Sequence, residues 1–177
     1  MIERFGKDVF ESLDEILRPP HTALVVLEPR QSAHAVMASR LFRLVSAARA
    51  AGVCVVWVST LSPVYGEQHG ADYSLPETLL PWHGELVLTK TTLNTFISTG
   101  LALTLRGLGK RTVLTAGMAT EGSVESTAEG AAHRDFYSVV AEDCTASLSP
   151  AFHEDALAIL RMRVQAVDSE RIISIWE

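Results

Sequence analysis

The chain has few of the residues on which disulfide-rich domains and cysteine metal sites depend. Only two of its 177 residues, Cys54 and Cys144, are cysteines, too few for a disulfide framework or a cysteine zinc site. Basic residues are also in the minority, with 15 Lys and Arg against 21 Asp and Glu and a formal net charge of -6. Because nucleic-acid binding needs a basic face to replace counterions, this balance excludes a nucleic-acid partner.

Long hydrophobic runs are missing as well. No stretch approaches the roughly 18 apolar residues of a transmembrane helix. The first residues, MIERFGKDVFESLDEIL, are acidic and amphipathic and lack the basic and apolar regions of a secretory signal. We therefore expect a cytoplasmic location and no membrane partner. The same segment could pack on its own domain or on a neighbouring subunit.

Six short apolar runs alternate with stretches that have apolar residues at helical spacing. The runs are continuous rather than alternating, as expected of strands buried on both faces of a parallel sheet. Together with a composition that is 47% hydrophobic and 20% charged, this pattern predicts one domain over residues 1–177, a three-layer α/β/α sandwich with a doubly wound, mostly parallel six-stranded sheet. The predicted strands are 22–27, 53–59, 86–89, 112–116, 137–141 and 164–167, and the predicted helices lie within 32–52, 97–109, 123–135 and 150–162. Gly52 and Gly109 stand where helix C-caps are expected.

Residues 61–85 link one predicted strand to the next with little regular pattern and three prolines. Long irregular loops in compact domains are commonly functional. This loop contains several aromatic and histidine residues, Tyr65, His69, Tyr73, Trp82 and His83. They suit a pocket wall or lid, or equally a surface loop held by a few aromatic anchors.

Polar groups follow three of the strands at the edge where doubly wound sheets bind ligands. They are Glu28, Lys90 and the turn GMATEGSVEST. In this order, HTALVVLEP, KTTLNTFISTGLALTLRGLGKRTVLTAG and GMATEGSVESTAEGAAHRDFYSVVAEDCTAS resemble segments of the isochorismatase-like (cysteine) hydrolase superfamily. The resemblance extends over nearly the whole chain, and His153 with the ALAIL run is similar to the family's last helix.

The resemblance implies a catalytic set of Glu28, Lys90 and Ser123. Lys90 matches the family lysine, whereas Glu28 replaces the catalytic aspartate and Ser123 the nucleophilic cysteine. The resemblance also implies a cis Met118–Ala119 peptide and an oxyanion hole made by the N–H groups of Ala119 and Ser123. The Asp-x-His metal motif of nicotinamidase-like members has no counterpart, so no metal or other cofactor is expected. Relatives commonly form dimers or tetramers, which implies that this chain is a homo-oligomer. The resemblance also implies a small-molecule substrate or ligand, bound in a pocket that is formed by Tyr65, Trp82, Phe96, Met118 and Thr120.

The replaced residues leave several functional hypotheses open. The chain is a hydrolase of a small acid or amide that cleaves a vinyl-ether or C–N bond, or a catalytically inactive relative that keeps the fold and pocket for ligand binding or assembly. In the first case Ser123 needs a base to accept its proton. Glu28 could serve, although a neighbouring Lys90 lowers the pKa of the carboxylate and makes it a weaker base. Alternatively, His69 or His83 could reach Ser123 from the loop. In the second case Ser123 is an ordinary polar residue of a helix's first turn. A serine introduced in place of cysteine is a third reading, against which Glu28 argues, because one inactivating change would suffice.

Overall fold

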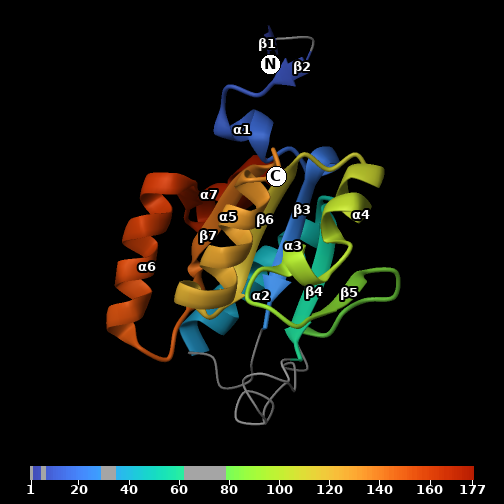
Figure 1. The fold of residues 1–177 in the computed structure, drawn as a ribbon. Coiled ribbons are helices and arrows are strands. Elements are labelled where there is room, and N and C mark those ends of the chain that lie inside the picture. Colours follow the sequence, from blue (N-terminus) through green and yellow to red (C-terminus); the bar gives the residue numbers. More distant parts are fainter. Residues whose placement is uncertain (1, 5–6, 29–34, 62–78) are drawn as a thin grey trace.

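The structure is a computed structural model that describes residues 2–4, 7–28, 35–61 and 79–177. Its centre is a sheet of six strands in the order β5-β4-β3-β6-β7-β8, all paired in parallel (Figure 1). The strands are β3 (Thr22–Leu27), β4 (Cys54–Thr60), β5 (Leu86–Lys90), β6 (Thr112–Met118), β7 (Tyr137–Ala146) and β8 (Gln165–Val167). Each matches a predicted apolar run, and the predicted sheet is confirmed as parallel throughout.

Helices cover both faces of the sheet and complete the predicted three layers (Figure 1). One face carries α2 (Ala35–Ala50) and α7 (Ser169–Trp176). The other carries α3 (Thr95–Ser98), α4 (Leu101–Gly107), α5 (Glu125–Ala132) and α6 (Pro150–Arg163). The helix α7, whose N-cap Asp168 accepts the Arg171 N–H at 2.9 Å, was not among the predicted helices.

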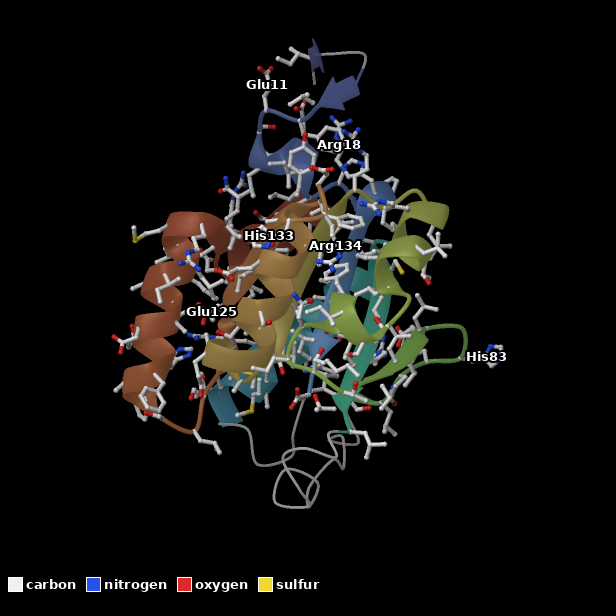
Figure 2. All side chains as sticks on the ribbon, in the orientation of Figure 1. Glu11, Arg18, His83, Glu125, His133 and Arg134 are labelled. Atoms are coloured by element: carbon white, nitrogen blue, oxygen red, sulfur yellow. The ribbon has the colours of Figure 1, made fainter. Side chains whose placement is uncertain are left out.

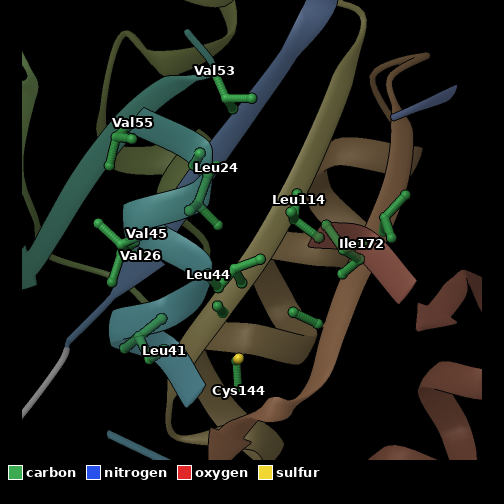
Figure 3. Packing of buried hydrophobic residues seen from close by; sticks show 14 of the residues in the cluster. Leu24, Val26, Leu41, Leu44, Val45, Val53, Val55, Leu114, Cys144 and Ile172 are labelled. Carbon is green, nitrogen blue, oxygen red and sulfur yellow. The ribbon is translucent and has the colours of Figure 1, made fainter. Parts of the chain in front are cut away.

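The core explains why the strand sequences are continuously apolar. All six residues of β3 are buried, since helices pack against both of its faces. Figure 3 shows Leu41, Leu44 and Val45 of α2 lying against Leu24 and Val26 of β3. Burying one such side chain stabilises the fold by about 1.5–3 kcal/mol, so the apolar run of β3 favours a position covered on both faces.

Three helix ends turn through the left-handed region, two of them at the predicted caps Gly52 and Gly109. Gly52 and Gly109 have φ of 72° and 68°, values that glycine adopts without a steric penalty. Asp135 follows α5 at φ 63°, a conformation that the short polar side chain of Asp tolerates better than most residues do. These caps end the helices a few residues before the next strand begins.

The amphipathic N-terminal segment packs on its own domain through Phe10 and α1, whereas its hairpin stands away from the sheet (Figure 1). A hairpin of β1 (Ile2–Arg4) and β2 (Lys7–Val9) leads into α1 (Leu13–Ile16) and the short helix η1 (Pro19–His21). Phe10 is buried and stacks on Tyr137, with ring centroids 5.1 Å apart. The structure therefore shows Phe10 and Ile16 packed on their own domain. In the described part of the chain, no helix is long and apolar enough to span a membrane.

Candidate active site

Three side chains from separate segments meet at the carboxyl edge of the sheet. Glu28 directly follows β3, Lys90 ends β5, and Ser123 lies in the turn between β6 and α5. The Ser123 hydroxyl donates to Glu28 Oε1 at 2.5 Å, and the Lys90 ammonium donates to Ser123 Oγ at 2.7 Å. Lys90 Nζ also lies 3.0 Å from Glu28 Oε1. The structure thus brings together the three residues that the resemblance singles out, and all three are buried.

The strand order causes this convergence. β3 lies between β4 and β6, so the chain leaves β3 towards one half of the sheet while the other half begins at β6. Such a switch point opens a crevice at the carboxyl ends of the strands.

Glu28 itself has a φ of 43°, a left-handed conformation that costs a non-glycine residue about 1–2 kcal/mol. Its N–H donates to the Val58 carbonyl at 2.8 Å.

Thr60, the last residue of β4, is a fourth member of the cluster that sequence reasoning missed. Its hydroxyl donates to the same Glu28 Oε1 at 2.5 Å. The sequence offered one signal, a hydroxyl residue at the carboxyl end of a predicted strand. That signal becomes useful only once β4 is known to be the neighbour of β3.

The Lys90 ammonium is held by backbone as well as by side chains. Lys90 is fully buried, and its Nζ donates to the carbonyls of Thr92 and Leu93 at 3.1 Å each. A buried charge is tolerated where a counter-charge and hydrogen bonds replace its hydration. Glu28 supplies the counter-charge, and the two carbonyls accept hydrogen bonds. The turn after β5 therefore binds the Lys90 ammonium group in place of water.

Burial and pairing act in opposite directions on the two ionisable groups. Burial alone raises the pKa of Glu28, but the Lys90 charge and the hydrogen bonds from Ser123, Thr60 and Lys90 outweigh it and leave this pKa below its ordinary value. Burial lowers the pKa of Lys90, and the Glu28 charge offsets part of that effect. Glu28 is therefore an anion at neutral pH, able to accept a proton from the Ser123 hydroxyl that already points at it.

The turn that carries Ser123 has an unusual backbone. The Met118–Ala119 peptide bond is cis, as the resemblance implies. A π-helical turn, η4 (Thr120–Val124), follows it, and the Ala119 carbonyl accepts the N–H groups of Gly122 and Val124 at 3.1 Å each. Ser123 thus sits at the start of a helix, where backbone N–H groups favour developing negative charge. The oxyanion hole of Ala119 and Ser123 N–H groups stays a prediction.

Glycine is required just before this turn. Gly117 has a φ of 116°, and a Cβ built on it would lie 1.9 Å from the Leu27 carbonyl oxygen. The missing side chain lets β6 approach the end of β3 closely. This contact brings the Ser123 turn within reach of Glu28.

The predicted pocket residues do not all lie at this edge. Thr120 is fully buried in the Ser123 turn, and Met118 and Phe96 are buried in the two core clusters. Phe96 stacks on Phe136 with centroids 5.8 Å apart, which is a core contact. Trp82 requires a correction, because it precedes the amino end of β5, the end opposite Lys90, where it is 62% exposed and lies over Arg49.

His83, one of the two histidines that could have served as a base for Ser123, lies away from it. His83 is exposed, and Figure 2 shows it at the outer edge of the molecule near β5, pointing away from the sheet. Tyr65, Tyr73 and His69 fall outside the described residues. In the part of the chain that the structure describes, no three or more His, Cys, Asp or Glu residues form a group that could hold a metal ion.

Comparisons with known proteins agree with this fold. A family model described as Isochorismatase domain matches residues 24–171. The chain is 32% identical over 152 residues to the ureidoacrylate amidohydrolase RutB of Methylobacterium radiotolerans, covering 68% of this chain and 59% of that protein. It is 30% identical over 143 residues to the RutB of Klebsiella pneumoniae, covering 63% and 61%. The chain therefore spans about three fifths of the length of these curated relatives.

Solved structures share the architecture at lower identity. A cysteine hydrolase from Pseudomonas syringae pv. phaseolicola superimposes with a TM-score of 0.81 at 18% identity, over 89% of this chain and 93% of the other. An N-carbamoylsarcosine amidase from Thermoplasma acidophilum does so with a TM-score of 0.70 at 23% identity, over 84% and 96%. At these identities the likeness concerns the fold.

Proposed function

Since the chain belongs to the isochorismatase family, we propose that it hydrolyses the C–N bond of a small amide or carbamoyl compound, with Ser123 as the nucleophile. One observation carries the proposal. The Ser123 hydroxyl is held between a carboxylate that accepts its proton, at 2.5 Å, and an ammonium group at 2.7 Å. A serine nucleophile needs such a proton acceptor within hydrogen-bond reach.

The geometry supports a double-displacement reaction. Ser123 Oγ attacks the carbonyl carbon and its proton passes to Glu28, while the Lys90 ammonium and the N–H groups of the turn stabilise the negative charge that develops. Collapse of the tetrahedral intermediate breaks the C–N bond, and the leaving nitrogen takes the proton from Glu28. Water then attacks the acyl ester, again giving a proton to Glu28, and releases the acid with Ser123 restored.

The same site is less suited to vinyl-ether cleavage. That reaction requires a protonated carboxyl group to donate a proton to carbon, and the pKa of Glu28 lies below its ordinary value despite the opposing effect of burial, because Lys90 and three hydrogen bonds stabilise the anion. A carboxylate that is ionised at neutral pH accepts protons rather than donating them. The names of the ureidoacrylate amidohydrolases and of the N-carbamoylsarcosine amidase point to the same bond class, so carbamoyl acids are the first substrates to try.

A substrate panel with one nucleophile variant tests the proposal. Ammonia release is measured for ureido acids, N-carbamoyl amino acids and simple amides, with the native chain, Ser123→Ala and Ser174→Ala. Ser174 is exposed on α7 and serves as the matched control. We expect Ser123→Ala to lower kcat by at least roughly 1,000-fold, with Ser174→Ala unchanged.

Two results would contradict the proposal. Equal turnover by the native chain and Ser123→Ala would show that Ser123 is not the nucleophile. No turnover of any compound, together with an upward shift in melting temperature on adding one of them, would support the inactive relative that binds ligands.

A further inference from the structure

The turn that carries Ser123 is tied to the start of α6 by two side-chain contacts. Thr120 Oγ1 lies 2.8 Å from His153 Nδ1, and Glu121 Oε1 accepts the Ser147 hydroxyl at 2.8 Å. Ser147 lies between β7 and α6, and His153 lies in the first turn of α6. Two consecutive residues of the nucleophile turn are therefore held by one neighbouring segment.

Thr120 depends on His153 for its hydrogen bond. Thr120 is fully buried, and in the part of the chain that the structure describes, the His153 ring is the one partner of its hydroxyl. A buried hydroxyl that loses its only partner is left without a hydrogen bond and without water to replace it, which is unfavourable. The orientation of Thr120, three residues before Ser123, is therefore coupled to the position of the imidazole.

His153 is itself held in place by the first turn of α6. Ser149 caps the helix by accepting the Phe152 N–H at 3.4 Å, and the His153 N–H donates to the Ser149 carbonyl at 3.0 Å. The ring borders a cavity of about 250 Å³ that is also lined by Val36, Met37, Ala146 and Pro150.

We infer that His153 is a positioning residue which, through Thr120, sets the backbone of the nucleophile turn and thereby the reactivity of the group at position 123. The inference rests on the proposed function of Ser123. Backbone N–H groups stabilise negative charge on the nucleophile only while they point at it, and misplacement by about 1 Å can reduce a rate roughly 100-fold. His153 touches no reacting atom, so its effect is on reactivity and not on substrate contact.

The test measures nucleophile reactivity without any substrate. In a Ser123→Cys background, the rate of alkylation by iodoacetamide is followed against pH, with mass spectrometry to locate the modified residue. Burial raises the pKa of the Cys144 thiol to about 12, and burial also raises the pKa of Cys54. Both native thiols therefore react slowly and are counted separately.

The variants distinguish the loss of the hydrogen bond between Thr120 and His153 from the loss of side-chain volume at position 153. We expect His153→Ala and Thr120→Val each to slow alkylation at position 123 about tenfold, because fewer N–H groups then stabilise the thiolate. The double variant should be no slower than either single variant, since both changes break one hydrogen bond. His153→Asn, whose amide can reach the place of Nδ1, should restore most of the rate. In the Ser123 form, His153→Ala should lower kcat with little change in KM.

A histidine elsewhere provides the control. His133 is exposed at the end of α5 (Figure 2), and His133→Ala should leave the alkylation rate unchanged. Equal rates for folded His153→Ala, folded Thr120→Val and their parent would overturn the inference. If His153→Ala does not fold, the alkylation rates of the near-isosteric Thr120→Val and the conservative His153→Asn test the inference instead. A slow Thr120→Val with a nearly normal His153→Asn would support it. A native chain without turnover would end the proposed function, yet the alkylation rates would still show whether His153 positions the turn.

Discussion

Ser123 and Glu28 are 95 residues apart in the chain, and a hydrogen bond of 2.5 Å joins their side chains. Glutamate is one methylene longer than the aspartate usual in the family, a difference of about 1.5 Å of reach. At residue 28 this longer side chain leaves a left-handed backbone with φ 43° and still meets the hydroxyl at position 123. The glutamate at position 28 therefore makes the contact that the proposed function requires between a proton acceptor and the Ser123 hydroxyl.

The buried pair of Lys90 and Glu28 should behave as a unit in stability measurements. Lys90→Met removes the counter-charge of a buried carboxylate, and we expect it to lower the free energy of unfolding by about 3–5 kcal/mol at pH 7. The double variant Lys90→Met/Glu28→Gln should lose clearly less than the two single losses added together. Urea denaturation gives all four values. Lys110→Met, which removes an exposed hydrogen bond to the Pro20 carbonyl, is the control, and additive losses would contradict a coupled pair.

Stability should depend on pH through Glu28. Its folded-state pKa lies below the ordinary 4.5, since Lys90 and the hydrogen bonds outweigh the effect of burial. As the pH falls, the unfolded chain therefore binds this proton first, so the contribution of Glu28 is present above about pH 4.5 and is lost progressively below it. Urea midpoints between pH 6 and pH 3, compared for the native chain and Glu28→Gln, measure the difference. Parallel curves for the two proteins would show that Glu28 does not contribute.

Thr60 should tune the basicity of Glu28. Its hydroxyl donates to Glu28 Oε1 at 2.5 Å and so favours the carboxylate over the acid. Thr60→Val removes that donor, raises the pKa of Glu28 and should move the acidic limb of the kcat/KM profile to higher pH. Ser59→Ala is the neighbouring control, because the Ser59 hydroxyl lies near Leu88 and Thr89 instead. An unmoved acidic limb in Thr60→Val would mean that another group controls it.

Gly117 should tolerate no side chain. In Gly117→Ala the new Cβ meets the Leu27 carbonyl oxygen at 1.9 Å in a residue with φ 116°, and we expect a loss above about 3 kcal/mol. Gly52→Ala is matched in having a positive φ, 72°, but nothing lies within 4 Å of its Cβ, so about 1–2 kcal/mol is expected. Urea denaturation compares the two. Losses of similar size would show that the backbone of β6 moves away from β3 without difficulty.

The sequence by itself predicted the six strands of the sheet and the helices α2, α4, α5 and α6, but not α7. Continuous apolar runs predict buried parallel strands because both faces of such strands are covered, and the structure confirms β3, with all six residues buried, as the clearest case. The left-handed helix ends at Gly52, Gly109 and Asp135 follow from local backbone sterics, which neighbouring residues in the sequence decide. The ends of the predicted strands pointed to Glu28, Lys90 and the GMATEGSVEST turn, and the family resemblance implied catalytic roles for Glu28, Lys90 and Ser123.

Tertiary structure alone decided how these elements meet. The strand order places Thr60 beside Glu28, and the packing of α6 brings His153 to Thr120. None of these pairings has a local signal, because contacts between distant segments depend on which strands are neighbours and how closely helices approach. A periodic pattern specifies which face of an element is buried, whereas the sum of packing over the whole domain selects what that face touches.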